Sequence, residues 1–370
     1  MRVFWILVLA ASLGACVDRT QSPTTPAALT IGSNQTIFVA TSREEASDGR
    51  FGFERSEQLS LLEYTVSIPP SHTLGGLKFG YGKPDPQTEF VIADRHEFDS
   101  SKAFQSRVRK ALAKLPPKHR EVTVFVHGFN TTQAETAFRA AQLSHDLEQP
   151  GLTIIYSWPS QGKALGYVYD NDSMLFARDG LEQLFRGLNA TGPIHVNVVA
   201  HSLGGALLME TLRQIDIQTP GLAAQLVNSV ILISPDLDIE VFRRQMSRLK
   251  RAPDPFVIFV SKKDKVLNVS SMLRGKGRVR LGNIDNIEKV SDLPVEIVDT
   301  TAFSGDAGST HFILATSPAL IALLNRPQAI NDTFYSEDLS LDNFVRGHTV
   351  AAGGGKALRV VLSPGIDGSE

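Results

Sequence analysis

From residue 121 onward, short apolar runs alternate with segments whose apolar residues recur at helical spacing. The expected strands are EVTVFVHG, LTIIYSW, IHVNVVAH, LVNSVILISPD, PFVIFVSKKD and VEIVDTT. These runs are apolar almost throughout, so other elements must cover both faces of the sheet that they form. Covered strands that alternate with amphipathic helices predict an α/β fold with a doubly wound, mostly parallel sheet.

The sequence before this alternation predicts an N-terminal strand extension of the sheet. The candidate strands there are residues 36–44, 61–72 and 90–94. Residues 101–115 have helical spacing, and Pro116 ends that helix. We therefore expect one domain over residues 31–325. The tail, residues 326–370, is polar and Gly-rich, and its sequence assigns it no structure.

Residues 1–15 have the pattern of a secretory signal peptide: a basic start, an apolar run too short to span a membrane, and small residues. The segment LGAC resembles the lipobox of bacterial lipoproteins, which implies cleavage before Cys16 and lipidation of that cysteine. We expect residues 16–30, rich in Pro, Ser and Thr, to hold the lipidated cysteine and a flexible tether. An ordinary signal peptide, with Cys16 incidental, is the alternative.

The lipoprotein interpretation predicts an exported protein that acyl chains on one residue anchor in the bacterial cell envelope. Val17 follows the cysteine, in place of the aspartate that retains some lipoproteins at the inner membrane. The outer membrane is therefore expected in a Gram-negative cell. Cys16 is the only cysteine, which excludes an internal disulfide and cysteine-based metal sites.

The charge balance argues against two classes of partner. A formal net charge of −2 on 370 residues gives no basic footprint for nucleic acid and no polybasic signal for anionic lipid. The sequence has no H-E-x-x-H and no complete calcium-loop spacing, and GGGK lacks the Ser or Thr of a P-loop. We therefore expect no metal and no cofactor.

The segment AHSLGG places a single serine, Ser202, between a predicted strand and a predicted helix. A sharp strand-to-helix turn exposes such a serine but crowds the positions two before and two after it, here Ala200 and Gly204. Ala200 replaces the first glycine of G-x-S-x-G, while the strand and helix on either side agree with that motif. Ser202 is thus the candidate nucleophile, and a serine that only caps the helix is the alternative.

Chain order selects the candidate base. Where a nucleophilic serine sits on such a turn, the acid and then the histidine follow it in the chain. Only His311 and His348 follow Ser202, and His348 lies in the tail. His311 lies between the last predicted strand and an apolar helix, where the base is expected. A surface or capping histidine is the alternative.

Three aspartates compete for the role of the acid that orients the histidine. Asp264 follows the strand PFVIFVS, whereas Asp236 and Asp238 follow the strand before it. Asp264 is favoured because, in folds with such a serine turn, the acid usually lies in the loop after the later strand. Asp236 and Asp238 stay open, with capping of the following helix as their other interpretation.

The backbone N–H groups of Leu203 and Phe129 are the expected oxyanion donors. Leu203 begins the helix after the serine, and Phe129 lies in the loop after VFVHG, where Gly128 permits close backbone approach. His127 precedes Ser202 in the chain, so we expect it to brace this loop rather than to act as the base.

Together these segments resemble the α/β-hydrolase superfamily, and more closely a bacterial family of α/β-hydrolases of unknown function. The segments that carry the resemblance are IFVATSR, VFVHGFN, IIYSWPSQG, Y-x-x-D-x-x-S, AHSLGG, VILISPDLD and FVSKKDKVL. The resemblance implies the α/β-hydrolase fold and the triad roles of Ser202, Asp264 and His311. It implies little about the substrate.

These expectations combine into one predicted function. We expect a serine hydrolase of the cell envelope that cleaves the carboxylic ester of a small acyl substrate through an acyl-enzyme. The same residues could serve a thioester, an amide or an acyl transfer. A catalytically idle α/β-hydrolase fold that acts as a binding or scaffold lipoprotein is the alternative.

Overall fold

The computed structural model describes residues 18–20, 22–273, 279–284, 286–305, 307–325, 348–351 and 358–361. The predicted signal peptide and Cys16 lie outside these residues, as does most of the predicted tail. Within the described part of the chain, no helix is both long and apolar enough to cross a membrane.

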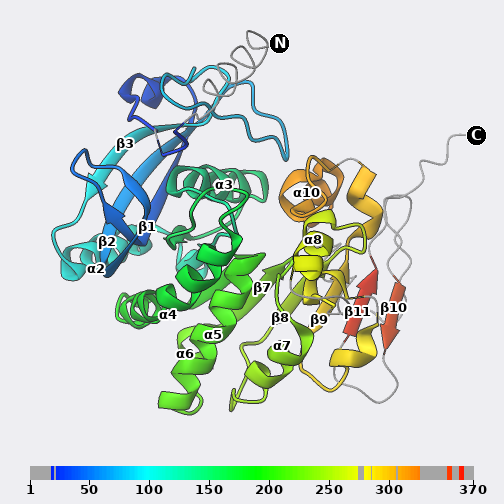
Figure 1. The fold of residues 1–370 in the computed structure, drawn as a ribbon. Coiled ribbons are helices and arrows are strands. Elements are labelled where there is room, and N and C mark those ends of the chain that lie inside the picture. The colour runs from blue at the N-terminus through cyan, green and yellow to red at the C-terminus, as the bar shows by residue number, and fades with distance from the viewer. Residues whose placement is uncertain are drawn as a thin grey trace, which may run out of the picture.

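The strands form one sheet in the order β10-β11-β9-β8-β7-β6-β4-β5-β1-β2-β3 (Figure 1). In chain order they are β1 (Ser33–Glu45), β2 (Phe51–Ile68), β3 (Val91–Glu97), β4 (Glu121–Val126), β5 (Leu152–Ser157), β6 (His195–His201), β7 (Ser229–Ile233), β8 (Phe256–Val260), β9 (Glu296–Asp299), β10 (His348–Ala351) and β11 (Leu358–Val361). From β1 across to β11 every neighbouring pair is parallel, and β2, β3 and β10 add antiparallel edges. The predicted mostly parallel sheet with an N-terminal strand extension is confirmed.

Helices cover both faces of this sheet. They are α2 (Ser101–Lys114), α3 (Gln133–Asp146), α4 (Tyr167–Asn189), α5 (Leu203–Gln218), α6 (Ala223–Leu226), α7 (Ile239–Met246), α8 (Lys265–Leu273), α9 (Ile313–Thr316) and α10 (Pro318–Leu324). Short 3₁₀ turns are η1 (Pro26–Thr30), η2 (Pro117–His119), η3 (Leu281–Asn283), η4 (Ile287–Val290) and η5 (Thr301–Gly305). Helices α3 and α10 lie on one side of the sheet and α4, α5 and α7 on the other (Figure 1).

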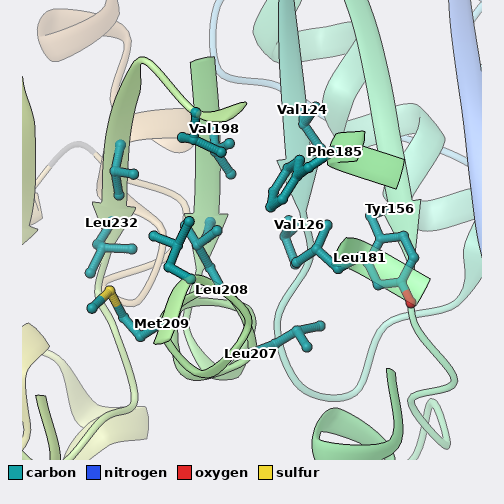
Figure 2. Close-up of a cluster of buried hydrophobic side chains, with 14 of the residues drawn as sticks. Val124, Val126, Tyr156, Leu181, Phe185, Val198, Leu207, Leu208, Met209 and Leu232 are labelled. Atoms are coloured by element: carbon teal, nitrogen blue, oxygen red, sulfur yellow. The ribbon is translucent and has the colours of Figure 1, made fainter. Parts of the chain in front are cut away.

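The two faces have separate apolar cores because side chains alternate along each strand. On β4, Val124 and Val126 pack with α4 and α5, whereas Phe125 between them packs with α3 and α10. Figure 2 shows part of the first core, where Leu208 of α5 lies beside Val198 of β6. A doubly wound sheet needs apolar residues on both faces, which is why its strands read as continuous apolar runs.

The predicted flexible tether over residues 16–30 is wrong for its last part. Residues 26–30 form η1, whose Ala28 is fully buried against β3. The N–H of Thr25 donates to the carbonyl of Ile92 at 2.8 Å, and the hydroxyl of Ser67 donates to the carbonyl of Ala28 at 3.0 Å. Pro26, in the first turn of η1, has a fixed φ that suits it. The proline that suggested a linker therefore starts a docked turn.

Two strands lie in the segment to which the sequence assigned no structure. Strand β11 pairs in parallel with β9, and β10 pairs antiparallel with β11, which extends the sheet beyond β9. Each has four residues. Such short pairings gain their order from the sheet edge they join, a contact that lies outside the local sequence.

Helix α5 carries the turn before it only if its buried face stays packed. Leu208 is fully buried, whereas Ile217 on the same helix is 53% exposed. We expect Leu208→Ala to lower the free energy of unfolding by about 2–5 kcal/mol, because a cavity replaces the lost contacts. Ile217→Ala should change it by less than about 0.5 kcal/mol. Urea titration followed by circular dichroism measures both, and equal losses would contradict this packing.

Candidate active site

Ser202 occupies a strained turn between β6 and α5. Its φ is 53° and its ψ is −122°, a backbone conformation that a non-glycine residue rarely adopts. Its side chain makes no capping hydrogen bond to the helix, so the capping alternative has no support. Backbone hydrogen bonds hold the turn: its N–H donates to Ile233 at 3.0 Å, and its carbonyl accepts from the N–H of Asp236 at 3.1 Å.

Small residues allow this turn, as the sequence predicts. A Cβ placed on Gly204 would lie 2.3 Å from the carbonyl oxygen of His127, closer than any real contact. A Cβ on Gly128 would lie 2.9 Å from the Cβ of Ser202, so the loop after β4 also presses against the serine. Ala200 is fully buried. The close approach of α5 and the β4 loop is the physical reason for the G-x-S-x-G spacing.

Asp264 and His311 form a direct pair. The Nδ1 atom of His311 lies 2.7 Å from Oδ2 of Asp264, which is fully buried. The other oxygen, Oδ1, accepts the N–H groups of Val266 and Leu267 at 3.0 Å in the first turn of α8. The carboxylate is therefore fixed by a helix N-terminus and by the imidazole. A carboxylate at Nδ1 selects the tautomer that leaves Nε2 free to accept a proton.

Contacts through His201 bring the His311 loop to the nucleophile turn. Nε2 of His201 lies 3.1 Å from the carbonyl oxygen of His311, and the two ring centroids are 4.7 Å apart. The His201 ring also stacks on Phe312 at 4.0 Å. Because His201 directly precedes Ser202, His311 lies beside the serine's turn. Among the described residues, no hydrogen bond yet joins Ser202 Oγ to His311, a contact that often tightens only with substrate bound.

The structure separates the three candidate acids. Asp236 is an ion-pair partner of the buried Arg280, at 2.9 Å, and accepts the hydroxyl of Tyr167 at 2.7 Å. Asp238 is the N-cap of α7 and accepts the N–H groups of its first turn. Asp264 alone of these three contacts His311. The capping interpretation of Asp238 is confirmed, while Asp236 belongs to a separate buried network.

The two expected oxyanion amides come from the start of α5 and from the loop after β4. Leu203 is the first residue of α5, so its N–H has no partner inside the helix. This N–H is part of the positive end of the helix dipole. Phe129 follows Gly128, which packs on Ser202. The Phe129 ring meets Tyr167 edge to face at 5.4 Å. That contact links the β4 loop to the start of α4.

Comparison with known proteins assigns most of the chain to a family. The family described as "Alpha/beta hydrolase of unknown function (DUF900)" matches residues 100–327. The chain belongs to this α/β-hydrolase family. The matched stretch contains Ser202, Asp264 and His311, so all three site residues lie in the shared domain. No curated protein matches the chain.

Two solved structures of hydrolases are similar to this α/β-hydrolase. Dienelactone hydrolase from Anabaena variabilis is 12% identical over 80% of this chain and 96% of its own, with a TM-score of 0.38. Lipase B from Aspergillus fumigatus is 13% identical over 62% of this chain, with a TM-score of 0.36. This chain covers 57% of the length of that lipase.

His127 of this α/β-hydrolase is a buried, neutral brace. Its ring stacks on Trp158 at 4.8 Å, and the indole N–H of Trp158 donates to the His127 carbonyl at 2.7 Å. Burial, with the charge of Arg43 as a second cause, lowers the pKa of His127 to about 3. Burial likewise lowers the pKa of His201 well below its usual range. Neither histidine therefore competes with His311 as the proton acceptor.

Sequence reasoning missed a buried charged network that contacts the loops after β4 and β5. Arg43, 1% exposed, donates to the carbonyls of Thr131 at 2.8 Å and Ser160 at 3.0 Å. Burial lowers its pKa to about 10. The sequence signal for this network was the position of Arg43 near the end of an apolar strand. A charged side chain there must find partners inside the protein.

Asp170 completes this network from α4. It is fully buried and accepts the Ser160 hydroxyl at 2.6 Å and the N–H groups of Gln161 at 2.6 Å and Asn130 at 3.2 Å. Burial raises its pKa, and the charge of Arg43 opposes that shift. Arg43 and Asp170 thus bind the same two loops, which follow β4 and β5. These loops carry the expected Phe129 donor and Trp158.

The low pKa of His127 predicts a pH-dependent stability. The pKa of His127 is 6.5 ordinarily and about 3 in the folded protein. Between these pH values the unfolded state binds a proton at His127 and the folded state does not. The contribution is therefore present above pH 6.5 and is lost as the pH falls through this window. Glutamine cannot titrate, so the free energy of unfolding of His127→Gln should not show this loss. As the pH falls from 6.5, the difference in free energy of unfolding between parent and variant should shrink by up to about 1.4 kcal/mol per pH unit. Urea titrations at several pH values measure this, and a constant gap would contradict it.

Proposed function

We propose that this protein is a serine hydrolase that cleaves a carboxylic ester through a covalent acyl-enzyme. The observation that carries the proposal is the Asp264–His311 pair, 2.7 Å apart, beside the strained turn of Ser202. A strained nucleophile turn, a histidine with an acid at Nδ1, and free amides at a helix N-terminus are the parts that acyl transfer requires.

The steps follow from these positions. Ser202 Oγ attacks the ester carbonyl carbon while Nε2 of His311 takes the hydroxyl proton. The carbonyl oxygen gains negative charge and accepts hydrogen bonds from the N–H groups of Leu203 and Phe129. The bond to the leaving alcohol breaks as His311 returns the proton to the alcohol oxygen. Water then attacks the acyl-enzyme by the same route, while Asp264 holds the orientation of the His311 ring.

Exposed apolar side chains near the site favour a substrate with an apolar acyl group. Leu165 and Val168 are 98% and 77% exposed, and they flank Tyr167. The hydroxyl of Tyr167 lies 2.8 Å from Ser270 of α8, whose neighbours Val269 and Met272 are also exposed. These side chains belong to the segments that carry Tyr167 and Ser270, and the Tyr167 ring contacts Phe129. Such exposed apolar side chains fit the acyl half of an ester better than a charged group.

We expect the full-length protein to react with a fluorophosphonate probe, because the probe's phosphorus accepts an activated serine hydroxyl. Ser202→Ala should abolish labelling. Asp264→Asn should slow it by about 10⁴-fold, because the histidine loses the group that fixes its tautomer. Gel fluorescence over time gives the rates.

The matched control is Asp238→Asn, which keeps the cap of α7 and should label at the parent rate. A folded parent that does not label would contradict the hydrolase proposal. It would leave the idle fold, acting as a binding or scaffold lipoprotein, as the better description. Labelling of the parent would be followed by esters, thioesters and amides of varied acyl length.

We also propose that the chain is lipidated at Cys16 and anchored in the cell envelope, on the strength of the LGAC segment. In a bacterial host, the parent should incorporate a labelled fatty acid and sediment with membranes. Cys16→Ser should lose both properties, since the thiol is the acyl acceptor. Fatty-acid incorporation that persists in the variant would contradict the assignment.

A further inference from the structure

Three side chains from two distant segments converge outside the active site. His72 lies in the turn after β2, and His145 and Asp146 end α3. One ligand atom from each, an imidazole nitrogen or a carboxylate oxygen, lies within 4.8 Å of the other two. The catalytic proposal uses none of these residues.

Neighbouring groups fix the carboxylate of Asp146. It is buried, and its Oδ2 accepts the N–H of Gly75 at 2.8 Å and the side-chain amide of Gln142 at 2.5 Å. Its Oδ1 faces Nε2 of His72 at 2.6 Å. Hydrogen bonds of this kind to the second oxygen orient a carboxylate for metal coordination through the first.

The two histidines complete the set. The His72 ring is held edge-on against Phe90, at 5.3 Å between centroids, and its centroid lies 5.6 Å from that of His145. Among the residues that the structure describes, the ring nitrogens of His145 have no hydrogen-bond partner. His145 is only partly buried, so an ion and its water can reach the cluster from solvent.

We propose that His72, His145 and Asp146 bind a divalent transition-metal ion, with Zn²⁺ as the best match. Two imidazoles and one carboxylate are ligands that Zn²⁺ accepts at about 2.0–2.2 Å, with water as a fourth. To admit the ion, His72 Nε2 and Asp146 Oδ1 must separate from 2.6 Å to roughly 3.3 Å, the edge of such a tetrahedron. A rotation of the His72 side chain in its surface turn can supply this.

This ion would fasten elements that support the His311 loop. Gly75, which donates to Asp146, packs on the backbone of Thr316: a Cβ there would lie 3.1 Å from it. The Thr316 hydroxyl exchanges hydrogen bonds with the backbone of Ser309, whose Oγ accepts the N–H of His311. The side-chain amide of Asn325 donates to the carbonyl of Asp146 at 2.6 Å. The role of the ion is therefore structural.

The competing explanation is that His72 and Asp146 form only an ion pair, with His145 as a bystander. The two explanations differ at His145, which takes no part in the ion pair. His145→Ala should leave the ion pair and the unfolding midpoint in EDTA unchanged. It should weaken Zn²⁺ binding by at least about tenfold, because a ligand is lost.

The test is calorimetric titration of ZnCl₂ into the full-length, tag-free protein after removal of metals with EDTA. One saturable site is expected, with a rise of the melting temperature when Zn²⁺ is present. His72→Ala and His145→Ala should each weaken the site, and His195→Ala, an exposed histidine at the start of β6, should not. No saturable binding, or an affinity that both ligand variants leave unchanged, would overturn the proposal.

Discussion

Parallel pairing of β4, β6, β7 and β8 is the constraint on which the rest of the site depends. Parallel strands end at the same edge of the sheet, so the loops that follow them meet there. Gly128 and Phe129 follow β4, Ser202 follows β6 and Asp264 follows β8. The segment from Gly128 to Asp264 spans more than 130 residues, and the hydrogen-bond register of the sheet brings these loops to one edge.

The second support is a buried set of charges rather than an apolar contact. Arg43 and Asp170 hold the loops after β4 and β5 through hydrogen bonds to backbone groups. Buried charges cost desolvation, so such a pair adds little net stability. What it contributes is position, because each loop carbonyl or amide has one donor or acceptor that fits it. Hydrogen bonds inside the protein thus fix the loop after β4 in place.

The histidines of this protein differ in chemistry because their surroundings differ. His127 is buried and His201 is partly buried, neither has a carboxylate partner, and both pKa values are lowered. His311 has the carboxylate of Asp264 at Nδ1, 2.7 Å away, which fixes the orientation of its ring. His72 and His145 are partly exposed, and their ligand atoms lie within 4.8 Å of that of Asp146. Position in the fold, and not residue type, assigns each histidine its role.

The sequence alone determined the parallel sheet, the nucleophile turn at Ser202 and the pairing candidates Asp264 and His311. Apolar runs and small-residue spacing are local properties, so they can be read from neighbouring letters. The contact between Asp264 and His311, the Arg43 network and the meeting of His72 with Asp146 were decided only by the tertiary structure. Each depends on contacts between segments far apart in the chain, and no local pattern encodes which side chains a closed sheet and its helices bring together.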